Sequence, residues 1–148
     1  MAMKGARLLY VTALVVLLAD IASKFAVRSA LNVGESVAVL PFLSLTHIQN
    51  TGIAFGMLQF DILRWALVAV ALGVAVAIVW SCKEHKLNEH YLAWGLIAGG
   101  AVGNALDRVF IGTVTDFINF HFWPAFNVAD SALSIGVVLL AWHAFRKE

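Results

Sequence analysis

The sequence predicts a single membrane α-helical domain (residues 1–148) with four transmembrane helices, a small β-like platform on its outer face and an interfacial loop. Hydrophobic residues make up 61% of its 148 residues and charged residues only 13%. Soluble domains are about 45–50% apolar and about 25% charged, so this chain has too little polar surface for a water-exposed globule. Four long apolar segments and an uneven distribution of basic residues support the same fold class.

The four apolar segments are each close to the roughly 20 residues that a membrane-spanning helix needs. They cover residues 8–27, 65–82, 91–111 and 129–145. The third segment carries Gly95, Gly99 and Gly103 at four-residue intervals, on one helical face. In lipid, small residues at this spacing let neighbouring helix backbones approach closely. We therefore expect the third helix at the centre of the bundle.

Basic residues predict the orientation, because short loops rich in Lys and Arg remain in the cytoplasm. One side of the predicted bundle carries six of them: Lys4, Arg7, Lys83, Lys86, Arg146 and Lys147. The other side carries four, Lys24, Arg28, Arg64 and Arg108, two of which have an acidic residue nearby on the same helix. Both termini are expected to be cytoplasmic.

Two stretches, residues 32–61 and 112–128, then lie on the outer side. In the first, residues 43–46 alternate apolar with polar side chains, as in a half-buried strand. This pattern predicts the small platform at the membrane surface. The second contains an aromatic cluster typical of the headgroup boundary and is expected to be an interfacial loop: Phe117, Phe120, Phe122 and Trp123.

Composition also excludes several classes of function. A net charge of +1 argues against a nucleic-acid partner. The single cysteine, Cys82, excludes an internal disulfide framework and a cysteine-based metal cage. The histidines show no H-E-x-x-H pattern or neighbouring ligand set, so no metal or cofactor is expected.

Polar residues near the outer ends of the predicted helices are candidates for function. Asp20 and Lys24 have the four-residue spacing and order of an intrahelical ion pair, for which we expect a structural role close to the site. Asn104, Asp107 and Arg108 share one helical face. The donor fork of Arg108 could hold a lipid phosphate or a substrate carbonyl, or it could pair with Asp107.

Asp116 follows the third predicted helix and Asp130 opens the fourth. The connection between two adjacent helices could bring these carboxylates together. Two neighbouring carboxylates share one proton; the ionised one can take a proton from water while the other donates to a carbonyl oxygen. Asp130 alone also suits a helix N-cap. The spacing by itself only suggests a hydrolytic pair.

Five short motifs occur in order along the chain: residues 20–24 (Asp-Ile-Ala-Ser-Lys), 50–55 (Asn-Thr-Gly-Ile-Ala-Phe), 103–108 (Gly-Asn-Ala-Leu-Asp-Arg), 112–117 (Gly-Thr-Val-Thr-Asp-Phe) and 126–131 (Phe-Asn-Val-Ala-Asp-Ser). With these motifs on the predicted helices, the chain resembles the bacterial lipoprotein signal peptidases, the type II signal peptidase family of membrane aspartic peptidases. Each motif is short, but all five occur in this order on the expected helices, so the resemblance extends over most of the chain.

The resemblance implies that Asp116 and Asp130 are the catalytic dyad. It implies an enzyme of the bacterial cytoplasmic (inner) membrane, with its site near the outer face and without a cofactor. Its substrates would be diacylglyceryl-modified prolipoproteins, cleaved before the lipidated lipobox cysteine. Its other partner would be membrane lipid, and it would function as a monomer. Further residues expected to line or support the site are Asn50, Gly52, Asn104, Arg108, Asn127, Asp107, Asp20 and Lys24.

Two functions of other classes fit parts of the sequence. A proton- or cation-conducting protein would use intramembrane acids as a relay, but the second and fourth predicted helices have no acid in their central spans. A silent scaffold would use the glycine face of the third helix, which leaves Asp116, Asp130 and the asparagines unexplained.

Overall fold

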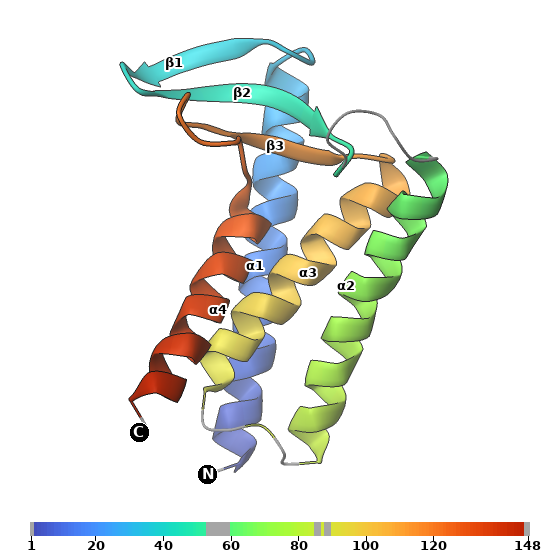
Figure 1. Cartoon of the computed structure of the whole chain (residues 1–148), viewed down its shortest axis with the longest axis vertical. Helices are drawn as coiled ribbons and strands as arrows, with labels where there is room; N and C mark the ends of the chain where they lie inside the picture. The colour runs from blue at the N-terminus through green and yellow to red at the C-terminus, as the bar shows by residue number, and fades with distance from the viewer. Residues whose placement is uncertain (1, 53–59, 85–86, 88–89, 147–148) are drawn as a thin grey trace.

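A computed structural model describes residues 2–52, 60–84, 87 and 90–146. Four helices, α1 (Ala2–Ala30), α2 (Phe60–Lys83), α3 (Tyr91–Phe110) and α4 (Val128–Phe145), accompany three strands, β1 (Ser36–Leu40), β2 (Leu43–Asn50) and β3 (Val114–Asn119). The strands form one sheet in the order β1-β2-β3. The sheet lies across one end of the bundle, and α1 begins and α4 ends at the opposite end (Figure 1).

The four-helix membrane prediction is confirmed. Among the described residues, three helices are long and apolar enough to cross a membrane, over Lys4–Ala30, Asp61–Lys83 and Val128–Phe145. The fourth, α3, has 20 residues and a length of about 30 Å, and it runs among the other three (Figure 1). Its polar side chains are tolerated because they face protein rather than lipid. With 29 and 24 residues, α1 and α2 extend beyond the predicted apolar segments.

The glycine face of α3 packs directly on α1, as predicted. A methyl group at Gly95 would lie 2.6 Å from the carbonyl oxygen of Leu9, and one at Gly99 would lie 2.6 Å from that of Ala13. One turn further, a methyl group at Gly103 would lie 2.6 Å from a carboxylate oxygen of Asp20. The absence of a side chain at Gly103 therefore leaves room for the buried carboxylate of Asp20 beside α3.

Replacing Gly99 with Ala should lower the free energy of unfolding by about 1–3 kcal/mol, because the new methyl group has to push the α1 backbone away. Gly73 of α2 is the matched control, since no described atom outside its own stretch of helix lies within 4 Å of the position of an added methyl group. Gly73→Ala should be neutral or stabilising by up to about 1 kcal/mol. Thermal unfolding of both variants in one detergent is the measurement, and equal melting temperatures would contradict the tight α1–α3 contact.

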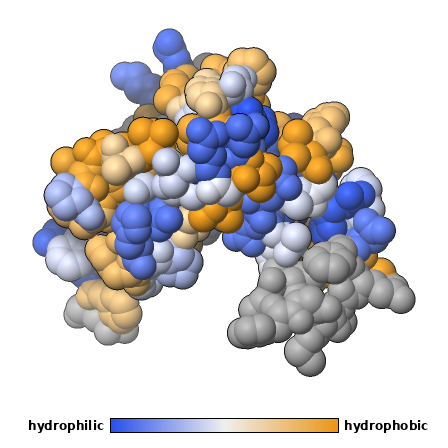
Figure 2. All heavy atoms as spheres, turned by 90° about the horizontal axis from the view of Figure 1, so that it is seen from above, coloured by the Kyte–Doolittle hydropathy of each residue, from blue (hydrophilic) through white to orange (hydrophobic). Residues whose placement is uncertain are grey.

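In the first half of β2, polar side chains are buried and the apolar side chain between them is exposed. In β2, Ser44 and Thr46 are only 4% and 8% exposed, whereas Leu45 between them is 38% exposed. Val37, which pairs with Leu45, is 50% exposed. Figure 2, which looks down on the sheet end, shows hydrophobic side chains at the surface beside hydrophilic ones. The predicted strand over residues 43–46 is confirmed as part of β2.

The stretch expected to be an interfacial loop contains the third strand instead. β3 pairs antiparallel with β2, so that Thr115 lies opposite Gln49 and Asp116 opposite Ile48. Its first four residues are buried on both faces of the sheet. Burial on both faces removes the alternation by which a strand is recognised in a sequence. Asp116 consequently lies on a hydrogen-bonded strand, which fixes its backbone.

Candidate active site

Asp116 is buried where β3 crosses the end of the helix bundle. Its side chain is 2% exposed. The Asn50 amide donates to its Oδ2 at 2.8 Å, and the Asn127 amide donates to its Oδ1 at 2.8 Å. Each carboxylate oxygen thus has one fixed donor, and the carboxyl plane cannot rotate freely.

Burial raises the pKa of Asp116 to about 6, and the negative charge of Asp130 adds to this effect. The hydrogen bonds from Asn50 and Asn127 and the positive charge of Lys24 act in the opposite direction. An unperturbed aspartate has a pKa of about 3.9. Asp116 can therefore keep its proton through weakly acidic pH, as a general acid requires.

Asp130 lies in the first turn of α4, held by a capping box. The N-cap of α4 is Asn127, whose side chain accepts from the Asp130 backbone N–H at 2.9 Å. In return, Oδ2 of Asp130 accepts from the Asn127 backbone N–H at 3.3 Å. The simple N-cap reading of Asp130 is wrong, because it occupies the third helical position. That position leaves Oδ1 to accept from Asn104 at 2.7 Å.

Asn127 joins the two carboxylates. It is fully buried, and its amide nitrogen contacts Asp116 while its amide oxygen and backbone hold Asp130. The amide nitrogen also donates to Oδ1 of Asn104 at 3.1 Å. Two carboxyl groups from β3 and α4 are thereby fixed in one polar site around a single asparagine.

The predicted ion pair between Asp20 and Lys24 is confirmed, with a distance of 2.7 Å between Nζ and Oδ2. Both side chains are at most 1% exposed. Lys24 also donates to Oδ1 of Asn104 at 3.0 Å, and Oδ1 of Asp20 accepts from the backbone N–H of Ala129 at 2.9 Å. The pair therefore connects α1 with α3 and α4 directly beneath the two carboxylates.

Asp107 is paired with α1 rather than with its neighbour Arg108. Its described ion pairs are with Arg28 at 3.0 Å and Lys24 at 3.5 Å. Oδ2 of Asp107 also accepts from the backbone N–H of Thr115 at 2.8 Å. The alternative in which Arg108 neutralises Asp107 is therefore wrong, and Asp107 anchors the beginning of β3 to α3.

Arg28 and Thr115 are two residues of this network that the sequence did not single out. One guanidinium nitrogen of Arg28 donates to Oδ1 of Asp107 and to Oγ1 of Thr115, both at 3.0 Å. Arg28 follows Lys24 by one helical turn, so its position on the same face as Asp20 was a usable signal. Thr115 offered no such signal, because its partners are distant in sequence.

Arg108 keeps part of its guanidinium available near the site. Nη1 donates to the Asn104 carbonyl at 3.3 Å, while Nε is buried without a hydrogen-bond partner in the described part of the chain. Gly52 turns the chain above it with a φ of 77°, and a methyl group there would lie 3.7 Å from Nη2 and 3.0 Å from Leu67. The rest of the predicted motif, residues 53–55, lies outside the described residues.

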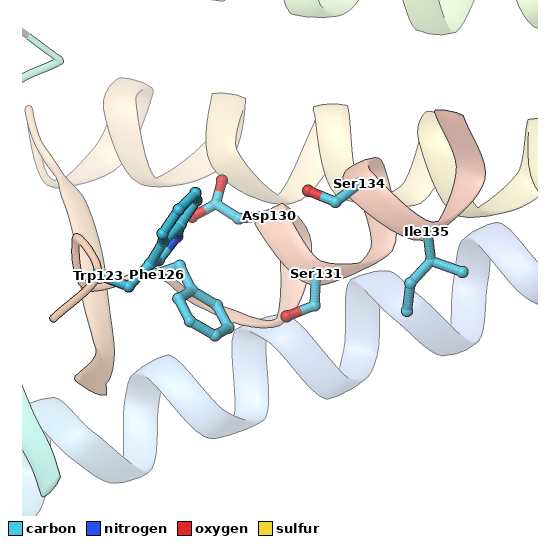
Figure 3. Close-up of a pocket in the computed structure, with 6 residues that line it drawn as sticks. All are labelled: Trp123, Phe126, Asp130, Ser131, Ser134 and Ile135. Atoms are coloured by element: carbon cyan, nitrogen blue, oxygen red, sulfur yellow. The ribbon is translucent and has the colours of Figure 1, made fainter. Parts of the chain in front are cut away.

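A cavity of about 320 Å³ opens beside Asp130 and continues along α4. Figure 3 shows Trp123 and Phe126 near the carboxylate, with the other lining residues further along the helix. The lining residues are Trp123, Phe126, Asp130, Ser131, Ser134 and Ile135. The lining therefore combines the Asp130 carboxylate with two serine hydroxyls and three apolar or aromatic side chains.

The fold and this site define a multi-pass membrane protein with two carboxyl groups fixed by asparagines at one end of its helix bundle. Comparisons with known proteins give the particular family. The family model described as Signal peptidase (SPase) II matches residues 12–146. The chain belongs to this family and is a peptidase, which confirms the resemblance read from the motifs.

Individual relatives agree with the family model. A lipoprotein signal peptidase of Burkholderia mallei (strain SAVP1) is 41% identical over 141 residues, which cover 90% of this chain and 85% of the relative. One from Alteromonas mediterranea is 39% identical over 150 residues, covering 96% and 82%. A bacterial membrane enzyme solved by the in meso method at 1.9 Å resolution is 29% identical, with a TM-score of 0.83 over 93% of this chain and 92% of its own. A second, solved at 2.3 Å, is 30% identical, with a TM-score of 0.81 over 92% and 86%.

Proposed function

We propose that the protein removes the signal peptide from diacylglyceryl-modified prolipoproteins, with Asp116 and Asp130 as its catalytic dyad. The observation that carries the proposal is the position of Asn127, whose amide and backbone hydrogen-bond both carboxyl groups. The names of the relatives supply the substrate class, and the site supplies groups able to hydrolyse an amide. Cleavage before the lipidated cysteine is part of the same proposal.

In the proposed reaction, Asp116 enters protonated and Asp130 accepts a proton from the attacking water. The water oxygen bonds to the scissile carbonyl carbon while Asp116 donates its proton to the carbonyl oxygen. The resulting diol collapses as the C–N bond breaks, and the departing amine takes the proton that Asp130 had received. A hydroxyl proton returns to Asp116, so both groups regain their initial states.

The surroundings of the dyad fit a lipid-bearing peptide. Nε of Arg108, which has no hydrogen-bond partner among the described residues, is the proposed donor to a substrate carbonyl. The cavity along α4 is the proposed place for the part of the substrate next to the scissile bond. We infer that the sheet end faces outward and both termini are cytoplasmic, since Lys4, Arg7 and Lys83 lie at the opposite end. All of the proposed site residues come from one chain, so a monomer suffices.

The direct test uses the purified protein in lipid bilayers with two forms of one precursor, with and without diacylglyceryl on its cysteine. We expect cleavage of the modified form alone, giving a product that begins with the lipidated cysteine by mass spectrometry. Cleavage of both forms at equal rates would contradict the proposed lipid specificity. Cleavage of neither form by folded protein would contradict the substrate class.

The pH dependence of cleavage should report on Asp116. Because the acid must be protonated, the rate should fall as pH rises through about 6. Asn50→Ala removes a hydrogen bond that lowers the pKa of Asp116, so the falling limb should move to higher pH. Asn119→Ala is the control on the same strand, because Asn119 bonds Thr46 and His121 instead. If Asn50→Ala did not shift the falling limb of the pH–rate profile, Asp116 would not be the general acid.

A further inference from the structure

A second cavity lies between α2 and α3, apart from the residues of the carboxylate site. Its volume is about 470 Å³. We propose that this groove binds one anionic phospholipid, with the lipid phosphate on Lys83 and one acyl chain along α2. The groove is lined by Leu72, Ala75, Val76, Val79, Trp80, Lys83 and Val102.

The groove results from the way α2 is packed. Its lining residues on α2 recur every three or four positions and so share one helical face. Ala75 on this face is buried, but Val76 is 67% exposed and Trp80 57% exposed. In Figure 1, α2 lies at the side of the bundle, with α3 between it and α4. One side of the groove is therefore closed by α3, and the other is open to the membrane.

Lys83 gives the groove its charge selectivity. It is the last residue of α2, at the end of the bundle opposite the sheet (Figure 1). Within the described residues, its ammonium group has neither an ion pair nor a side-chain hydrogen bond. Basic residues in pockets between transmembrane helices bind anionic lipid headgroups, and Trp80 one turn away is typical of the headgroup boundary.

The length of the groove matches one leaflet. From Lys83 to Leu72 there are 11 residues (83 − 72) along α2, which is about 16 Å at 1.5 Å per residue. Half of the hydrocarbon core of a bilayer is about 15 Å thick. A chain whose headgroup is held at Lys83 would therefore end near the midplane, beside Leu72 and Val102. All lining residues except Lys83 are apolar or aromatic.

The test uses full-length protein in phosphatidylcholine bilayers that contain phosphatidylglycerol with a photoreactive acyl chain. After irradiation, we expect the label on residues 72–83 by mass spectrometry. Lys83→Gln should reduce this labelling about fivefold, as expected for the loss of one Lys–headgroup contact. Arg7→Gln is the charge control, because Arg7 lies at the same end of the bundle outside the groove lining.

A second pair of variants tests the apolar part of the groove. Val76→Trp should fill the groove and exclude the chain, whereas Val70→Trp should not. Val70 is 64% exposed, close to the 67% of Val76, but it does not line the groove. The proposal would be overturned in favour of ordinary annular lipid if a phosphatidylcholine probe labelled these residues as strongly as the phosphatidylglycerol probe and Lys83→Gln did not change the labelling. Protein–protein crosslinks through the same residues would overturn it in favour of a second copy, and neither outcome depends on peptidase activity.

Discussion

Replacing either Asp116 or Asp130 with Asn should reduce prolipoprotein cleavage by about 10²–10⁴-fold, the usual contribution of general acid–base catalysis. Asparagine keeps the volume of the side chain but neither takes a proton from water nor donates one as an acid. At position 130 it can still accept a hydrogen bond from the Asn127 backbone, so α4 should keep its capping box. The measurement is single-turnover cleavage of the lipid-modified precursor.

Asp61→Asn is the matched control for loss of a carboxylate. Asp61 lies in the first turn of α2, and its side chain is 84% exposed. This variant should cleave at the wild-type rate. An Asp130→Asn protein that also cleaved normally would overturn the dyad assignment. The melting temperature of each variant separates lost chemistry from lost folding.

Replacing Lys24 with Met should destabilise the protein by about 3–5 kcal/mol, the range measured when one partner of a buried ion pair is removed. Lys24 is the charge partner of Asp20, which is completely buried, and it also faces Asp107. Its removal leaves Asp20 as a buried carboxylate without a cation. The free energy of unfolding, measured by denaturant titration in mixed micelles, gives the size of the effect.

A double variant tests whether the effect comes from the uncompensated charge. In Asp20→Asn/Lys24→Met, the amide oxygen at position 20 can still accept from the Ala129 N–H that Asp20 bonds at 2.9 Å. No isolated charge remains at that position, so part of the lost stability should return. If the single Lys24→Met variant proved as stable as the wild type, the pair would not hold α1 to α3 and α4 as described.

The helices and the local ion pair could be predicted because their signals lie within short segments. Apolar length identified the spans, and the four-residue spacing of Asp20 and Lys24 identified a pair that the structure contains. The glycines of α3 predicted its central place for the same reason. Each of these inferences needed only the geometry of a single helix.

The arrangement around the carboxylates required contacts that one segment cannot show. β3 has no alternating pattern because it is buried on both sides, so the sequence predicts a loop at Asp116 instead of a strand. Arg28 meets Thr115 across 87 positions of sequence. Asn127 lies between the two carboxyl groups because it caps α4 and because the register of β3 places Asp116 next to it. A pattern of residue spacings in the sequence cannot predict both features.

The partly exposed apolar side chains of the sheet have a consequence for the proposed mechanism. The proposed catalytic strand, β3, belongs to a sheet whose Val37 and Leu45 are partly exposed. With residues at the C-terminal end of α1, these two side chains line a cavity of about 260 Å³. We expect lipid to fill this apolar cavity in a bilayer, so that part of the free energy that holds β3 and Asp116 in place comes from the lipid. Turnover at the proposed site should therefore depend on the order of the acyl chains at the sheet end, and it should differ between bilayers and detergent micelles.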